Sequence, residues 1–266
     1  MKRASEARRW AEARGLTLKQ YRKLVTEHLR KLFRQMIPFR RCGAETLWGL
    51  LQGERLKSLF ETGTSSGLVD PNRRALVENE LFGIPKKDRH TVRPAYGYLH
   101  PDESGRVLGD EVWPYGDIAV RFKSDILERT TFTGGDSLDQ ISRNGSQNLL
   151  ARVVPDPVRH PTWLSFPWPL EDVLQYQTAE ELVRALYSVS PTLHYIEAQY
   201  QGDVTLADAH EVIFLKKPPS EEPLRRLHEE IRRRLNEEGI PYREAWQTES
   251  NGPKTSPDQH EDGGAR

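Results

Sequence analysis

Apolar residues recur at helical spacing near both ends of the chain and alternate with polar residues in its middle. Thr17 and Gln20 make a capping-box pair, and apolar positions then repeat every three or four residues up to Phe33. Met36-Ile37-Pro38 disfavours continuing that helix. The same reasoning predicts four more helices: residues 44–51, 71–81 with Asp70 as N-cap, 179–187, and a last one begun by Ser220 and ended by Gly239.

Strand patterns gather between these helices. An extended segment runs through Phe39 and Cys42, and we expect strands over residues 95–99, 118–122, 130–133, 192–200 and 211–215. Because strands are concentrated in the middle and helices lie at both ends, an α+β fold is favoured over alternating βα units. We therefore expect a basic helical arm over residues 1–34, one domain over residues 35–247, and a disordered tail over residues 248–266, where the composition is polar and small.

Charge and composition bound the class of protein. Cys42 is the single cysteine of 266 residues, so an internal disulfide is excluded, and no apolar run is long enough for a membrane span. The charged start lacks a secretory signal, which predicts a cytoplasmic protein, with export by a route that reads no cleaved signal left open. Residues 1–41 hold thirteen Lys and Arg against three Glu, a net of +10 in a chain of net charge zero. This arm could bind nucleic acid, an acidic partner or the acidic remainder of the chain, or form an ordinary solvated helical face.

Several motifs of known chemistry are absent. The chain has no P-loop, GxGxxG, HExxH or paired CxxC, so neither nucleotide hydrolysis by a P-loop nor a zinc site is supported, and we expect no metal. Gly134-Gly-Asp-Ser-Leu138 matches the local signature of GDSL-type esterases, with Ser137 as nucleophile. No histidine partner for Ser137 is identifiable, so the esterase is an alternative, beside an ordinary turn.

The strand at residues 192–200 carries a carboxylate and an amide, Glu197 and Gln199. Residues i and i+2 of a strand share one face about 7 Å apart, so the two side chains project together. Burying them costs free energy unless they are hydrogen-bonded, and they are therefore either satisfied internally or kept for a polar ligand.

The chain resembles the ADP-ribosyltransferase superfamily over residues 37–215. The likeness consists of Arg40 and Arg41 on a first strand, hydroxyl residues on a middle strand, and an acidic strand motif, here Glu197 with Gln199, in that order. The resemblance implies a split mixed/antiparallel β-sheet core with flanking helices, and NAD as the substrate. The strings FETGTS, RPAYGYL, RTTFTGGDS and YIEAQ are also similar to a group of uncharacterised bacterial and phage-associated proteins.

The resemblance implies roles for particular residues. Glu197 would stabilise the ribose as positive charge develops on it, and Arg41 would bind the diphosphate, with Arg40 facing the other way. The remaining NAD-binding candidates are two aromatic and three hydroxyl residues: Tyr96, Tyr98, Thr131, Thr133 and Ser137. Gln199 stands where the superfamily normally has its ribose-binding glutamate. Each group also has a structural reading: an acid partner for Arg41 and Glu197, β-propensity for the threonines, and core packing for the tyrosines.

Two functions follow from these observations. The first is an NAD-dependent mono-ADP-ribosyltransferase-like protein, a toxin, effector or phage-related modifier that acts on a protein or nucleic-acid target. The second is a non-catalytic interaction module of a phage or secretion assembly that keeps the fold without the activity.

Overall fold

The fold is taken from a computed structural model that describes residues 2–63, 70–85, 93–105, 112–134, 137–138, 164–165, 172–189 and 195–246. The last two residues of the FETGTS string, 64 and 65, and the predicted tail at residues 248–266 lie outside these ranges. The description below concerns only the residues within them.

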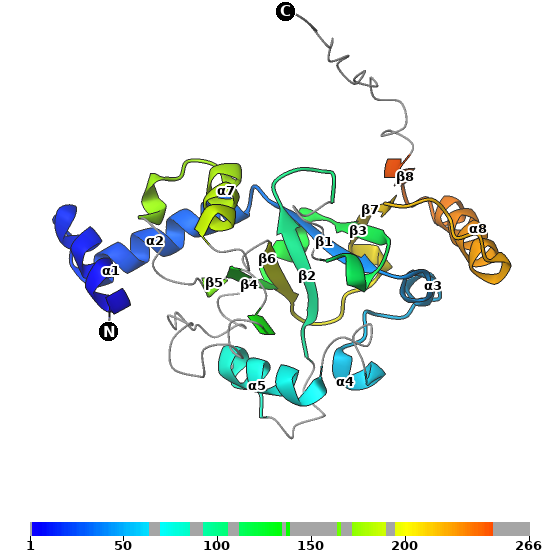
Figure 1. Cartoon of the computed structure of the whole chain (residues 1–266), viewed down its shortest axis with the longest axis horizontal. Coiled ribbons are helices and arrows are strands. Elements are labelled where there is room, and N and C mark those ends of the chain that lie inside the picture. Colours follow the sequence, from blue (N-terminus) through cyan, green and yellow to red (C-terminus); the bar gives the residue numbers. More distant parts are fainter. Residues whose placement is uncertain are drawn as a thin grey trace, which may run out of the picture.

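One mixed sheet of eight strands organises the described residues (Figure 1). Its order is β5-β4-β6-β2-β1-β3-β7-β8, with two parallel pairs at the edges, β4 with β5 and β7 with β8, and antiparallel pairs between them. This confirms an α+β fold with a mixed sheet. The strands are β1 (Ile37–Cys42), β2 (Ala95–His100), β3 (Ile118–Phe122), β4 (Thr130–Gly134), β5 (Leu164–Ser165), β6 (Ile196–Tyr200), β7 (Ala209–Phe214) and β8 (Tyr242–Glu244).

Seven α-helices lie around the sheet in the described part of the chain. They are α1 (Lys2–Ala13), α2 (Leu18–Phe33), α3 (Ala44–Leu51), α4 (Leu59–Thr62), α5 (Pro71–Phe82), α7 (Ala179–Val189) and α8 (Glu222–Glu237), with short 3-10 helices at Trp113–Tyr115, Ser124–Arg129, Val173–Gln175 and Leu206–Asp208. Helix α1 packs against α2, and α3 packs against α8. The two pairs lie toward opposite ends of the molecule, while α4 and α5 lie together along one side of it (Figure 1).

The helix boundaries agree with the local signals in most places. The Thr17–Gln20 capping box is present, and Asp70 caps α5 with Pro71 in its first turn. Ser220 is not the N-cap of α8, contrary to expectation, because the helix begins at Glu222 after Glu221. Pro223 lies in the first turn of α8, where a proline suits the helix start because no backbone N–H hydrogen bond is needed there.

On strands β3 and β7, successive residues alternate between two apolar clusters on opposite faces of the sheet. On β6, Ile196, Ala198 and Tyr200 belong to the larger cluster. That cluster also contains the buried face of α2, including Tyr21 and Leu29, so the second helix of the basic segment packs into the main core. The smaller cluster, around Phe39 and Tyr98, lies on the other face and leaves room there for polar groups.

Strand β1 changes partners along its length. It pairs with β2 only over Ile37–Phe39 and continues along β3 to Cys42, whereas β2 stays paired with β6 back to Ala95. Gly97 lies at the point of separation, where a Cβ atom would come within 2.2 Å of the Phe39 carbonyl oxygen and 2.6 Å of the Tyr200 ring. The missing side chain lets the Tyr200 hydroxyl reach the Phe39 carbonyl, at 2.8 Å. The two halves of the sheet therefore part beyond this point.

Candidate functional site

A cavity of about 690 Å³ lies where β1 and β2 separate. Its walls include Arg40 and Arg41 of β1, Tyr96 and Tyr98 of β2, and Glu197 of β6. Three strands that are far apart in the sequence thus bring five of the expected residues to one cavity. The volume is within the range of pockets that hold small organic ligands.

Glu197 is buried at the edge of this cavity, with 3% of its surface exposed. Its carboxylate oxygen Oε1 accepts hydrogen bonds from the Ser137 hydroxyl at 2.5 Å, from the Gln199 amide at 2.8 Å and from the Thr133 hydroxyl at 3.3 Å. All three donors bond to Oε1, and the contact of the second oxygen, Oε2, is with an arginine.

Arg74 of α5 faces that second oxygen. Its guanidinium lies 3.9 Å from Glu197 Oε2, donates to the Ser137 hydroxyl at 3.0 Å and stacks 3.9 Å above the Tyr96 ring. Arg74 is itself 5% exposed and lines the cavity. Sequence reasoning missed this residue, because an arginine in the second turn of a helix is ordinarily exposed and nothing in the local pattern marks it as buried.

Tyr96 and Tyr98 have different surroundings. Tyr98 stacks on Phe39, donates its hydroxyl to the Gly105 carbonyl at 2.5 Å and belongs to the smaller core cluster. Tyr96 lies under Arg74 and donates to the buried Glu78 carboxylate at 3.1 Å. Burial raises the pKa of both Tyr96 and Glu78, although neighbouring guanidinium groups oppose the rise. Of the two rings, Tyr96 is the one that joins the polar side of the cavity.

Two threonines of β4 form hydrogen bonds with the polar side chains of β6. Thr131 donates to the Gln199 side-chain oxygen at 3.0 Å, and the Gln199 amide donates to Thr133 at 3.0 Å. These three residues and Ser137 are buried, and none of them is among the cavity-lining residues. The structure therefore places Thr133, Gln199 and Ser137 as direct partners of Glu197, and Thr131 as a partner of Gln199, rather than on the cavity wall. The Ser137 hydroxyl contacts Glu197 and Arg74, and no histidine is among its contacts in the described residues.

Arg40 and Arg41 both reach the cavity, which differs from the expectation that Arg40 faces away. Arg41 is 3% exposed, and its Nε donates to the Gly116 carbonyl at 2.9 Å. Arg40 starts on the opposite face, but its long side chain bonds the Tyr96 backbone carbonyl across the gap between β1 and β2. Burial lowers the pKa of Arg40, and its buried Nε has no hydrogen-bond partner in the described part of the chain.

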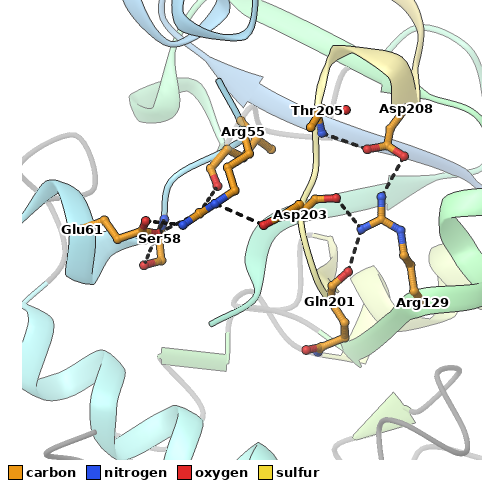
Figure 2. A network of polar contacts seen from close by, with 9 residues as sticks. Arg55, Ser58, Glu61, Arg129, Gln201, Asp203, Thr205 and Asp208 are labelled. Atoms are coloured by element: carbon orange, nitrogen blue, oxygen red, sulfur yellow. Dashed lines mark hydrogen bonds and ion pairs between the residues drawn. The ribbon is translucent and has the colours of Figure 1, made fainter. Parts of the chain in front are cut away.

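A network of polar contacts joins the part of the cavity wall formed by Arg55 to the connection between β6 and β7 (Figure 2). Arg55, which lines the cavity, bridges Glu61 at 2.5 Å and Asp203 at 3.1 Å. Its hydrogen bond lowers the pKa of Glu61 to about 2. Arg129 holds the same connection between β6 and β7 through the carbonyl of Asp203 and the carboxylate of Asp208. The wall is therefore fixed by side chains from four separate segments.

Neither a metal site nor a membrane span is found in the ranges that the structure describes. Among these residues, no group of three or more His, Cys, Asp or Glu side chains is placed to hold a metal ion. No helix among them combines the length and apolarity needed to cross a membrane. Cys42 lines the cavity, and burial raises the pKa of its thiol to about 11.

Comparison with known proteins relates this chain to a family and to two phage proteins. The family model described as "Protein of unknown function (DUF3626)" matches residues 39–222, which includes β6, β1 from Phe39 onward and all the residues that line the cavity. The "Gene 2 protein" of Mycobacterium phage L5 is 33% identical over 197 residues, covering 73% of this chain and 67% of the phage protein. The "Gene 2 protein" of Mycobacterium phage D29 is 30% identical over 178 residues, covering 64% of this chain and 61% of that protein.

Proposed function

This chain belongs to the DUF3626 family of proteins of unknown function, and we propose that it is an NAD-dependent mono-ADP-ribosyltransferase-like protein acting on a macromolecular target. The observation that carries the proposal is the meeting of Arg41, Tyr96 and Glu197 at one cavity between the diverging strands β1 and β2. A cation, an aromatic ring and a carboxylate are the groups that the diphosphate, nicotinamide and ribose parts of NAD require.

The cavity also fits an anionic ligand. Arg40 and Arg41 both line it, and the buried Nε of Arg40 lacks a hydrogen-bond partner among the described residues. A planar guanidinium suits phosphate oxygens because it presents several N–H donors in one plane. A phosphate-bearing ligand would supply acceptors for these donors and would offset the cost of burying the positive charge.

An ionised Glu197 would supply the charge that the proposed reaction requires. Transfer of ADP-ribose breaks the bond between nicotinamide and the ribose C1′, and nicotinamide leaves with the bonding electron pair. The target nucleophile then bonds to C1′ and loses a proton. Positive charge develops on the ribose meanwhile, and a fixed carboxylate stabilises that charge more than it stabilises the ground state. Ser137, Gln199 and Thr133 would hold Glu197 in place for this role.

One observation favours the second candidate, a non-catalytic interaction module. Glu197 is almost fully buried, its Oε1 accepts three hydrogen bonds, and its Oε2 faces the guanidinium of Arg74. A carboxylate satisfied in this way has a sufficient structural role without any ligand. The presence of Gln199 in place of the usual glutamate also favours the non-catalytic module.

Release of nicotinamide separates the two candidates. The purified chain is incubated with labelled NAD and a cell lysate, and free nicotinamide and label on macromolecules are measured. We expect Glu197→Gln to lower nicotinamide release by about 10² to 10³-fold, because the variant keeps the shape but loses the negative charge. Glu230→Gln is the matched control, since Glu230 lies on the exposed face of α8.

If no nicotinamide is released, NAD binding measured by calorimetry distinguishes a site that has lost the reaction from the absence of an NAD site. Binding that is weakened in Arg41→Ala, without turnover in any lysate, supports a module that has kept the site but lost the reaction. Absence of both NAD binding and nicotinamide release in the unmodified chain overturns the transferase proposal.

A further inference from the structure

Two helices of equal length, α2 and α8, carry equal numbers of basic residues but differ in acidic ones. Each has 16 residues. Helix α2 contains five Lys and Arg and one Glu, whereas α8 contains five Arg and four Glu. By subtraction the side-chain charge is +4 for α2 and +1 for α8. The positive charge of α8 is therefore largely balanced by glutamates of the same helix, whereas that of α2 is not.

The basic residues of α8 are paired with carboxylates. Arg226 lies 2.6 Å from Glu222, and Arg225 lies 3.0 Å from Glu229, both at a spacing of four residues. Arg233 is paired with Glu230 and Glu237 in the same way. Such pairs neutralise a helix surface and are typical of an ordinary solvated face.

The basic residues of α2 have few such partners. Its one carboxylate, Glu27, lies 3.8 Å from Lys23. Lys19, Arg22 and Lys31 are exposed, and no ion pair is present for them in the part of the chain that the structure describes. Like charges that lie one helical turn apart, as Lys19 and Lys23 do, repel each other. The uncompensated charge on this face therefore favours an external polyanion.

The shape of the basic face narrows the kind of polyanion. The apolar side of α2, with Tyr21, Val25 and Leu29, is buried in the main core, so the helix has no free apolar face to insert into a membrane. From Lys19 to Lys31 the helix rises about 18 Å, which is too far for a single phosphate to contact both. A nucleic acid offers charges along such a length, about one per 1.7 Å of duplex axis.

We propose that the exposed face of α2 that carries Lys19, Lys23 and Lys31, which lie within about 120° of one another around the helix, is a docking surface for nucleic acid, which it contacts through the phosphate backbone. The surface lies on a helix that contributes no residue to the cavity wall. The inference therefore does not depend on the cavity being catalytic, and it predicts binding without sequence preference.

The test compares two triple variants of the full chain. Lys19→Gln, Lys23→Gln and Lys31→Gln are combined on α2, and Arg225→Gln, Arg226→Gln and Arg233→Gln are combined on α8. Both variants lose three positive charges, but on α8 the lost charges are paired with glutamates of the same helix. Binding of a fluorescently labelled duplex DNA is measured by anisotropy over a series of salt concentrations, and circular dichroism checks that both variants are folded.

We expect the α2 variant to bind about tenfold or more weakly, with a slope of log affinity against log salt that is shallower by about 2.7, or 0.9 per lost phosphate contact. The α8 variant should bind almost as the unmodified chain does. Three outcomes would overturn the proposal: no DNA binding at low salt, equal losses in the two variants, or equally tight binding of polyglutamate, which would indicate an acidic protein partner instead.

Discussion

The two faces of strand β6 are both buried, but they are stabilised in different ways. Ile196, Ala198 and Tyr200 pack into the large apolar cluster, where stability depends on filled volume. Glu197 and Gln199, on the other face, depend on hydrogen bonds with the threonines of β4 and on the ion pair of Glu197 with Arg74 at 3.9 Å. An apolar face of this kind serves the fold alone, whereas a buried polar face that adjoins a cavity can also serve a ligand.

The largest stability effect is expected on the apolar face. Ile196→Ala should lower the free energy of unfolding by about 2–5 kcal/mol, because it removes buried carbon atoms and leaves a cavity. Urea denaturation measures the loss. Ile196→Val is the matched control, with an expected loss of about 0.5–1.5 kcal/mol. Equal losses in the two variants would show that this face is not packed as described.

A smaller effect is expected on the polar face. Arg74→Met keeps much of the side-chain volume but removes the charge beside Glu197 and the donor to Ser137. It should lower the free energy of unfolding by about 1–3 kcal/mol, since it leaves buried polar groups without a partner. Arg22→Met is the control, because Arg22 is exposed on α2, and its loss should stay within about 0.5 kcal/mol.

A double-mutant cycle sharpens this comparison. If Arg74 and Glu197 act together, the effects of Arg74→Met and Glu197→Gln should be non-additive by about 0.5–3 kcal/mol. Strictly additive effects would mean that the 3.9 Å contact does not couple the two side chains.

The smallest effect on stability is expected for the exposed ion pair between Arg55, which lines the cavity, and Glu61. Arg55 lowers the pKa of Glu61 to about 2 in the folded protein, from an ordinary value of 4.5. Because the folded-state pKa is lowered, the pair stabilises the fold above about pH 4.5, and this contribution is lost as the pH falls through about 2. Arg55→Ala should cost less than about 1 kcal/mol at neutral pH, because both side chains are more than a third exposed.

Urea denaturation at several pH values tests this prediction. The difference between Arg55→Ala and the unmodified chain should shrink between pH 4.5 and pH 2. A difference that grows in this interval would contradict the assigned sign.

Local sequence signals predicted most helices and strands but missed some elements. The capping box at Thr17, the N-cap at Asp70 and the strand at residues 118–122 were predicted correctly, because each depends on neighbours within a few residues. Helix α4 and strand β8 were not predicted. Strand β8 has only three residues and pairs with β7, so its conformation depends on a partner that the local sequence does not reveal.

The candidate site was predictable only in part. The common face of Glu197 and Gln199 follows from strand alternation, and the structure places both side chains on that face. The role of Arg74 could not be predicted, because its burial results from the packing of α5 against β2 and β6. The reach of Arg40 was also missed, since alternation gives the direction of a Cα–Cβ bond but not the end point of a long side chain.

The sequence by itself determined where most of the described helices and strands form and which side chains of a strand share a face, since both properties arise largely from nearby residues. Only the tertiary structure decided that Arg41 and Glu197 line one cavity and that Arg74 lies between Glu197 and Tyr96. Strand order and the separation of β1 from β2 result from the packing of the whole sheet, so no local pattern encodes them.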